Sequence, residues 1–358
     1  MKFLDKYSNK FKHFLNSNNR FDFVRLIAAW LVLYSHSYVL SASKDVELIS
    51  KYLRFDTAGG LAVGVFFSIS GYLVFKSLEN SSSLKIFIIK RVLRIYPALI
   101  LSVLFSIFFV GLICTDLSMQ EYLTNRKTLS YLKTISGFNI KYELPGVFES
   151  FPEKSVNGSL WSIAIELRCY LVLGLISLLP LSMKIKLWIS VMILSSLLLF
   201  RPIESPSDLS IKFMGLAYDF NKFGLMFTLG CLISSYEKHK NFHYIKFIGL
   251  ICACILIIII NVEISKFTLV AYNYLIPFII IWIGLYFTFL PKIPDKIGDI
   301  SYGLYLFSFP IQQLLIYLEL SSDLVIFIIL STTLSVVLSL TSWRYVEKPF
   351  LNLKNKLR

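Results

Sequence analysis

The chain has 358 residues, of which 56% are hydrophobic, and its formal net charge is +14 at pH 7. Soluble domains contain about 45–50% apolar residues, so this composition indicates an integral membrane protein with several spans. The basic residues lie in short segments between apolar runs, which excludes a nucleic-acid-binding protein and is typical of membrane-protein loops. The five cysteines form no C-x-x-C pair or ligand cluster, so we expect neither a disulfide framework nor a metal site.

Ten apolar runs are candidates for membrane-spanning helices, because about 20 residues cross the hydrocarbon core of a bilayer. They are 24–41, 59–78, 95–114, 160–180, 186–200, 220–235, 245–262, 269–290, 300–318 and 323–342. The sequence therefore predicts an all-α integral membrane protein in which about ten transmembrane helices form one bundle over 24–343. The first run has the basic flank of a signal peptide, but Arg25 and His36 interrupt it, so we expect a retained helix.

The positions of lysine and arginine predict the orientation, because cytoplasmic loops are enriched in these residues. They gather in the tails at 1–23 and 344–358 and in every second connection between the runs. Both termini are therefore expected in the cytoplasm, in agreement with an even number of spans. The long polar segment at 115–159 is then expected outside, and its glycines and prolines predict loops rather than a separate domain.

Arg25 and His36 lie eleven residues apart in the first apolar run. Eleven residues at about 100° each complete three turns to within roughly 20°, so both side chains share one helix face, about 16 Å apart along the axis. Arg25 alone fits an anchor at the cytoplasmic surface, and His36 alone fits a buried histidine bonded to a neighbouring helix. Ionisable groups inside membranes mark functional sites by default, and the shared face favours a functional pair.

Two further segments carry polar side chains at the predicted spans. The second run holds Ser70 and Tyr72, which fit a packing face with hydroxyl groups that bond across helices. Arg91 and Arg94 lie three residues apart, just before Tyr96. Their guanidinium groups share a helix face and suit either phosphate oxygens or an anchor on the cytoplasmic side.

The fourth run holds Trp161, Ser162 and Glu166, and it is expected to run from outside inward. Glu166 then lies about as deep as His36, and a carboxylate at that depth needs a partner or a proton. We expect a functional carboxylate here, with a structural ion pair or hydrogen bond as the alternative.

Two residues near the cytoplasmic ends of the last two runs are expected to have structural roles. Asp299 is placed to cap the helix at 300–318, because aspartate is a preferred residue before the first helical turn. Pro349 is expected to end the last helix, because proline lacks the backbone donor that a helix interior requires.

Taken together, these segments resemble the membrane acyltransferase-3 family, whose members O-acylate glycans and other envelope molecules of bacteria. The resemblance covers essentially the whole chain and rests on six motifs in order. They are Arg25-x10-His36, Phe66-Phe67-x-x-Ser70-Gly71-Tyr72, Arg91-x-x-Arg94-Ile95-Tyr96-Pro97, Ser159-Leu160-Trp161-Ser162 through Glu166, Ile300-Ser301-Tyr302-Gly303-Leu304-Tyr305-Leu306 and Glu347-x-Pro349. The resemblance implies a ten-helix fold, an acyl-coenzyme A donor and a catalytic site at Arg25 and His36. The chain departs from many members at Phe307-Ser308, where they carry a histidine.

We therefore expect a multi-pass O-acyltransferase in the bilayer of the bacterial cytoplasmic membrane. It would transfer an acyl group, with acetyl as the expected group, from cytoplasmic acyl-coenzyme A to a hydroxyl of an envelope polysaccharide or its lipid-linked precursor. Acyl-coenzyme A is a co-substrate, no permanently bound cofactor is expected, and the sequence is silent on oligomeric state. The alternative is a transporter or flippase of glycans or lipid-linked sugars, although we find no internal repeat of the kind that transporters often show.

The residues expected to carry this function fall into three groups. His36 is the expected general base, because histidine titrates near neutral pH, and Glu166 is its expected carboxylate partner. The residues expected to bind acyl-coenzyme A are Arg25, Arg91, Arg94 and Tyr96. Those expected in an acceptor or acyl pocket are Ser70, Tyr72, Trp161 and Ser162.

Overall fold

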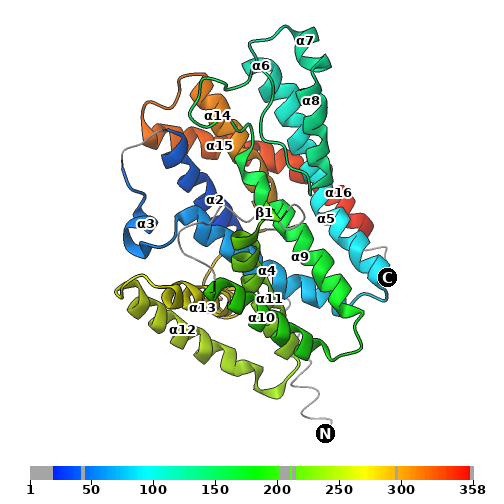
Figure 1. Ribbon diagram of the computed structural model, residues 1–358, viewed down its shortest axis with the longest axis vertical. Coiled ribbons are helices and arrows are strands. Elements are labelled where there is room, and N and C mark those ends of the chain that lie inside the picture. Colours follow the sequence, from blue (N-terminus) through cyan, green and yellow to red (C-terminus); the bar gives the residue numbers. More distant parts are fainter. Residues whose placement is uncertain (1–18, 42–44, 201–209, 212–214, 295–296, 355–358) are drawn as a thin grey trace. The chain divides into compact units, whose positions relative to one another are not determined.

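The computed structural model describes residues 19–41, 45–200, 210–211, 215–294 and 297–354 of the chain, and most of them are helical (Figure 1). The helices are α2 (Phe21–Leu40), α3 (Leu48–Leu53), α4 (Ala58–Glu79), α5 (Leu84–Phe105), α6 (Leu112–Cys114), α7 (Met119–Thr124), α8 (Arg126–Tyr131), α9 (Trp161–Ser177), α10 (Met183–Leu199), α11 (Ala217–Tyr236), α12 (Ile245–Ile260), α13 (Lys266–Tyr286), α14 (Ser301–Tyr317), α15 (Leu324–Ser342) and α16 (Lys348–Lys354). Two short strands, β1 (Ser210–Ile211) and β2 (Gly215–Leu216), pair antiparallel. The all-α fold class predicted from the sequence is confirmed.

The chain forms two compact units. Among the described residues, the first unit contains 19–25, 63–80 and those between 169 and 294, and the second contains those between 26 and 62, 81–168 and 297–354. Within the first unit, α10 packs against α11, and α13 packs against both α11 and α12. Within the second unit, α14 packs against α15 and α5. Most of the tail predicted at 1–23, and the end of the tail predicted at 344–358, lie outside the described residues.

Each of the ten apolar runs overlaps a helical segment of the described residues, although their bounds differ. Seven helical segments within the described residues are long and apolar enough to cross a membrane. They are Phe21–Leu40, Ala58–Glu79, Leu84–Cys114, Gly158–Ser177, Phe242–Ile260, Lys266–Tyr286 and Leu324–Leu353. The helices α10 and α14, with 17 residues each, are not among them, and neither is α11. The protein is thus a multi-pass membrane protein, and ten spans remain a prediction.

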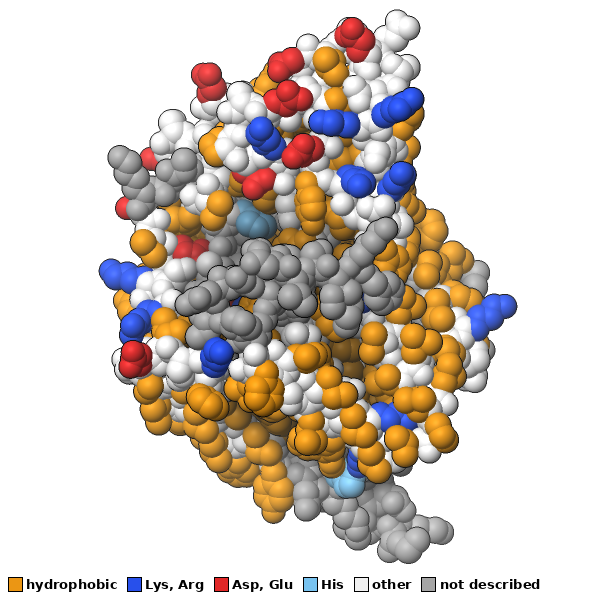
Figure 2. Space-filling model, viewed as in Figure 1, with side chains coloured by type: hydrophobic (Ala, Val, Ile, Leu, Met, Phe, Trp, Pro, Cys, Tyr) orange, Lys and Arg blue, Asp and Glu red, His pale blue; other side chains and the backbone are white. Residues whose placement is uncertain are grey.

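Apolar side chains are exposed along the helices that are expected to face lipid. On α12, exposed residues include Phe247, Ile251 and Ile258, and on α10 they include Met192 and Ile193. Figure 2 shows orange apolar side chains over α10 and α12, and charged side chains gathered over α7 and α8. Such apolar surfaces are stable where lipid replaces water, whereas charged surfaces belong in water. The α7–α8 segment lies in the polar segment predicted at 115–159.

One expectation about a helix end is wrong. The helix that contains the start of the run at 95–114 begins at Leu84, where Ser83 accepts a hydrogen bond from the Ile86 amide, and it includes Arg91 and Arg94, as expected, and Pro97. The last helix does not end at Pro349, because α16 continues it after a π-helical turn at Trp343–Glu347. Proline is tolerated in the first turn of a helix, and the wide π-helical turn before Pro349 makes Pro349 the second residue of a new α-helical segment.

Candidate functional site

His36 lies in the last turns of α2, in the part of that helix that belongs to the second unit, and it is half-buried. The ring of Phe309 from α14 meets the imidazole edge-on, with ring centroids 5.1 Å apart and an interplanar angle of 83°. The Nδ1 atom of His36 is shielded from solvent and has no hydrogen-bond partner within the described part of the chain. A shielded nitrogen of this kind costs free energy unless a partner group meets it. The atom is therefore available to a group that enters the site.

Gln312 of α14 holds the turn of α2 that contains His36. Its side-chain amide donates to the carbonyl oxygen of Leu33, at 2.9 Å, and to the hydroxyl of Ser37, at 2.8 Å. The Ser37 hydroxyl in turn donates to the Leu33 carbonyl, at 2.9 Å. Gln312 and Ser37 are fully buried, so these bonds are shielded from water and hold the backbone next to His36 in place.

Gln313, the next residue, holds a different segment. Its side-chain amide donates to the carbonyl oxygens of Glu153 and Ser155, at 2.8 Å each. Three residues further along, Gly158 packs on the ring that contacts His36. A Cβ atom at Gly158 would come within 2.7 Å of Phe309 ring carbons, so only glycine permits this approach. The segment 153–158 therefore lies against α14 beside the histidine.

Pro310 explains how the start of α9 is anchored. Because proline has no backbone N–H, the carbonyl oxygen of Leu306, four residues earlier, lacks its helical donor. The side-chain amide of Asn157 donates to this oxygen at 2.9 Å, and the hydroxyl of Ser102 donates to it at 3.2 Å. Asn157 also caps the following turn, since its side-chain oxygen accepts from the Ser159 amide at 3.2 Å. A helix defect in α14 thus positions the segment that leads into α9.

Tyr305 connects the predicted residues of α9 to the same face of α14. Its hydroxyl lies 2.7 Å from the Ser162 hydroxyl and donates to the Ser159 carbonyl at 2.6 Å. The charge of Glu166 acts electrostatically on Tyr305, and Trp161 is half-buried at the start of the helix. Ser162 and Glu166 thus interact with Tyr305 of α14. His36 contacts a different residue of the same helix, Phe309.

The three side chains Tyr305, Phe309 and Gln313 are spaced four residues apart on α14. Residues at this spacing lie on adjacent turns of one helix face. Along this face, Tyr305 meets α9, Phe309 meets the His36 ring, and Gln313 meets the segment at 153–155. We call it the α14 stripe.

Arg94 is paired with Asp299, a residue expected to have a different role. Its guanidinium forms an ion pair with Asp299, which also accepts a hydrogen bond from the Ser301 hydroxyl, at 2.5 Å. The expectation that Asp299 caps α14 is wrong, because the cap position is Ile300 and no side chain bonds there. The nearly buried Asp299 carboxylate is better stabilised by a guanidinium group than by a backbone amide alone.

The other predicted donor-binding residues differ in their surroundings. Arg91 is half-buried, with its guanidinium carbon 6.0 Å from the centroid of the Phe87 ring. The Tyr96 hydroxyl donates to the Ser136 carbonyl at 2.9 Å. In the first unit, Arg25 forms an ion pair with Asp22, at 2.6 Å and one turn away on α2.

Ser70 and Tyr72 belong to the first unit. The Ser70 hydroxyl lies 2.9 Å from the Tyr170 hydroxyl, and Tyr72 donates to the Glu237 carboxylate at 2.9 Å. Lys76 completes an ion pair with the same carboxylate, at 2.7 Å. These residues therefore make bonds that hold α4 to α9 and α11, as the packing interpretation of this motif predicts.

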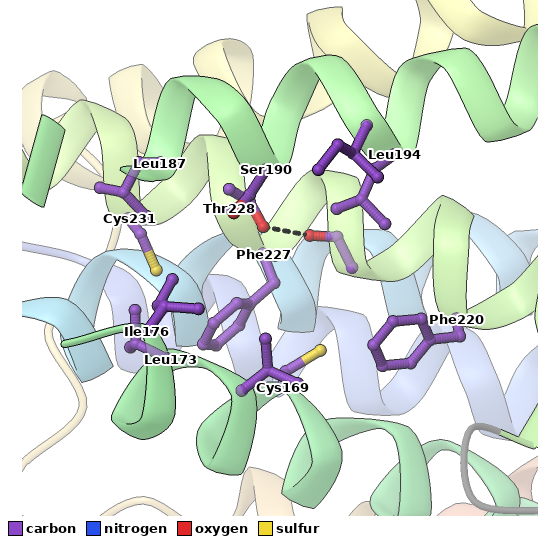
Figure 3. Close-up of a pocket in the computed structure, with 13 residues that line it drawn as sticks. Cys169, Leu173, Ile176, Leu187, Ser190, Leu194, Phe220, Phe227, Thr228 and Cys231 are labelled. Atoms are coloured by element: carbon purple, nitrogen blue, oxygen red, sulfur yellow. Dashed lines mark hydrogen bonds between the residues drawn. The ribbon is translucent and has the colours of Figure 1, made fainter. Parts of the chain in front are cut away.

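The first unit also contains an apolar cavity of about 160 Å³ between α9, α10 and α11. Figure 3 shows Leu173, Leu194 and Phe220 around it, together with Thr228. The Thr228 hydroxyl donates to the Gly224 carbonyl of its own helix, at 2.7 Å, so it offers the cavity little polarity. The lining suits hydrocarbon and carries no general base.

The fold defines a multi-pass membrane protein, and the shielded histidine among buried amides and hydroxyls marks a candidate functional site inside it. The chain matches the family model described as an acyltransferase domain over residues 18–344, and it belongs to the acyltransferase-3 family. It is therefore an O-acyltransferase.

Three relatives support this membership. The chain is 32% identical to an O-acetyl transferase of Shigella phage Sf6 over 348 residues, which is 94% of this chain and 97% of the relative. It is 30% identical to nodulation protein 10 of Rhizobium leguminosarum bv. viciae over 46% of each chain. It is also 30% identical to the peptidoglycan O-acetyltransferase OatA of Listeria monocytogenes, over 39% of this chain and 24% of OatA. No solved structure matches the chain.

Proposed function

We propose that the protein transfers an acetyl group from acetyl-coenzyme A to a hydroxyl of an envelope polysaccharide or of its lipid-linked precursor. The names of two relatives, an O-acetyl transferase and a peptidoglycan O-acetyltransferase, support the acetyl group and a glycan acceptor. They favour a transferase over a transporter. The observation that carries the proposal is the shielded Nδ1 atom of His36, which has no hydrogen-bond partner within the described residues and lies near the C-terminal end of a helix that can span the membrane.

In this proposal His36 is the general base. Its Nδ1 atom accepts the proton of the acceptor hydroxyl while that oxygen attacks the thioester carbonyl, so a C–O bond forms. The C–S bond then breaks, and the coenzyme A thiolate takes a proton from the imidazolium. The products are the acetyl ester and free coenzyme A, and the neutral imidazole is restored. Histidine suits both transfers because its proton affinity lies near neutral pH.

The donor is proposed to approach from the cytoplasmic side. Arg25 and His36 are about 16 Å apart along a continuous α2, a span comparable to the pantetheine arm that joins the nucleotide to the thioester. Arg25, Arg91 and Tyr96 remain proposed phosphate-binding residues on the basis of their motifs. Arg94 would contribute through the guanidinium donors that Asp299 does not use.

Trp161 and Ser162 are proposed to shape the pocket for the acceptor, because Ser162 is bonded to Tyr305 on the α14 stripe. Glu166 is proposed to act on this side of the site, since its charge reaches Tyr305. Ser70 and Tyr72 remain proposed pocket residues on the basis of their motif alone.

The proposed location is the bacterial cytoplasmic membrane, with ten spans, both termini in the cytoplasm and 115–159 outside. The charged side chains of α7 and α8 support an aqueous position for this segment.

The experiment that tests the function is mass spectrometry of the cell-surface polysaccharide from cells with and without the full chain. We expect an added acetyl mass that alkali releases as acetate. Equal masses in both samples, with the protein present in the membrane, would contradict the proposal.

A further inference from the structure

We propose that Glu153 is the carboxylate partner of His36, as a positioning residue that orients the imidazole and stabilises its protonated form. Glu166 is the residue expected in this role from the sequence. The inference rests on the proposed function, in which His36 is the general base.

The first argument is the way the segment around Glu153 is held. Gln313 binds the carbonyl oxygens of Glu153 and Ser155 at 2.8 Å each. The Glu153 carboxylate is itself oriented, because its Oε1 atom accepts a hydrogen bond from the Ser155 amide at 2.8 Å. This leaves the Oε2 atom for a second partner. A carboxylate fixed on one oxygen in this way directs the other with little loss of side-chain entropy.

The second argument is the position of this segment beside His36. Gln313 lies one turn after Phe309 on the α14 stripe, and Phe309 is the ring that packs against the imidazole. Gly158, five residues after Glu153, packs on the same ring. Gln312 holds α2 at Leu33 and Ser37. Adjacent turns of α14 thus hold both the histidine and the Glu153 segment.

The third argument concerns charge. Among the titratable groups of the described residues, Glu153 is the one whose charge acts on His36. From α14 the imidazole meets the uncharged ring of Phe309. Glu166 acts on Tyr305 instead. The two carboxylates therefore serve different parts of the site.

A general base in a membrane needs such a partner. When His36 accepts the acceptor's proton it becomes an imidazolium, and an isolated charge in this environment is costly. A carboxylate nearby offsets that cost and strengthens the base, as the acid member does in hydrolytic triads. Glu153 is half-buried, so its charge is only partly screened by water.

The test is the pH dependence of transfer in washed membranes that contain the full chain. The probe is acetyl-coenzyme A labelled in the acetyl group, and the signal is the alkali-labile label on the polysaccharide of those membranes. The range is about pH 3 to 9, so that the acidic limb and a shift of about one unit toward lower pH both fall inside it. The variants are Glu153→Gln, Glu153→Asp and the matched control Glu143→Gln, an exposed glutamate of the same polar segment.

We expect Glu153→Gln to lower the plateau rate about tenfold and to move the acidic limb of the profile about one unit toward lower pH. Loss of the carboxylate makes His36 a weaker base that is deprotonated at lower pH. Glu153→Asp keeps the negative charge but moves it away from His36, because the aspartate side chain is shorter. A smaller shift of the acidic limb toward lower pH is therefore expected. Glu143→Gln should match wild type.

An acidic limb that stays in place in Glu153→Gln would overturn the inference, whatever happens to the plateau, because a merely structural role lowers the rate without moving the limb. If Glu153→Gln does not accumulate, Glu153→Asp decides by the same criterion. The variant His36→Ala distinguishes failure of the proposed function from failure of the inference about Glu153. Wild-type transfer in His36→Ala would contradict the proposed function, whereas its loss together with an unmoved limb in Glu153→Gln would contradict this inference alone.

Discussion

Gln312 and Gln313 are neighbours on α14, yet their side chains hold two different segments: the turn of α2 that contains His36, and the segment at 153–155. Gln312 binds α2 at Leu33 and Ser37, and Gln313 binds the carbonyl oxygens of Glu153 and Ser155. Both amides are almost fully buried. Two adjacent polar residues in the middle of an apolar helix are therefore a framework for the site.

The first prediction concerns this framework. Gln313→Leu leaves two carbonyl oxygens without their donor, which should lower the free energy of unfolding by about 1–3 kcal/mol. The segment at 153–155 should loosen, and transfer should fall as well. Thermal unfolding of the purified protein and the membrane transfer assay measure the two effects. Gln120→Leu, at an exposed position of α7, is the matched control, and equal behaviour of the two variants would show that the bonds of Gln313 are unimportant.

Arg94 should have a structural role, through its ion pair with Asp299, that Arg91 lacks. Arg94→Ala leaves the Asp299 carboxylate buried without its partner, which should cost about 3 kcal/mol or more of stability. The double variant Arg94→Ala/Asp299→Ala should recover much of that loss. Arg91→Ala should leave the melting temperature near wild type and weaken acetyl-coenzyme A binding, with added dependence on salt. Calorimetric titration of the donor is the measurement, and unchanged donor affinity in Arg91→Ala would make Arg91 an anchor only.

Pro310 and Asn157 should be coupled. Asn157→Ala removes the donor to the Leu306 carbonyl and the cap of the following turn, and should destabilise the protein by about 1–3 kcal/mol. Pro310→Ala restores a backbone N–H that bonds the same oxygen. The double variant should then lose less stability than the two single variants added together, as thermal unfolding of all four proteins measures. If the stability loss of the double variant equals the sum of the two single losses, the Leu306 carbonyl oxygen does not hold the Asn157 side chain.

The orientation is tested by labelling at Asn139, which is exposed in the polar segment. In a Cys254→Ser background, where the exposed native cysteine is removed, Asn139→Cys should react with a membrane-impermeant thiol reagent in intact spheroplasts. Ser82→Cys, exposed in the connection between α4 and α5, should react only after lysis. The reverse pattern would invert the topology.

Much of the fold can be predicted from the sequence because long hydrophobic runs indicate membrane helices directly. The runs at 24–41 and 59–78 correspond closely to α2 and α4. The errors arise where a local rule leaves out a feature of the structure, either a distant partner or an irregular turn. Asp299 looked like a helix cap, but it pairs with Arg94, which is 205 residues away in the chain. Pro349 looked like a helix end, but a π-helical turn precedes it.

Of the two residues that the proposals pair, the sequence singles out His36 and not Glu153. His36 stood out because an ionisable residue interrupts an apolar run. Glu153 did not, because periodicity places residues on helix faces and gives no position to a residue in a loop. Its anchor, Gln313, is 160 residues away. The pair Gln312 and Gln313 inside an apolar run was the available signal, since buried amides in a membrane helix need partners.

The most direct test of the account is the rate of acetyl transfer by His36→Ala, measured with labelled acetyl-coenzyme A in membranes that contain equal amounts of protein. Loss of a positioned base removes about 10²–10⁴ in rate, so we expect transfer to fall by that factor while the melting temperature and donor affinity stay near wild type. His36→Gln should fail similarly, and His243→Ala, at an exposed histidine, should be unaffected. A folded His36→Ala protein with wild-type transfer would contradict the central claim that His36 is the base.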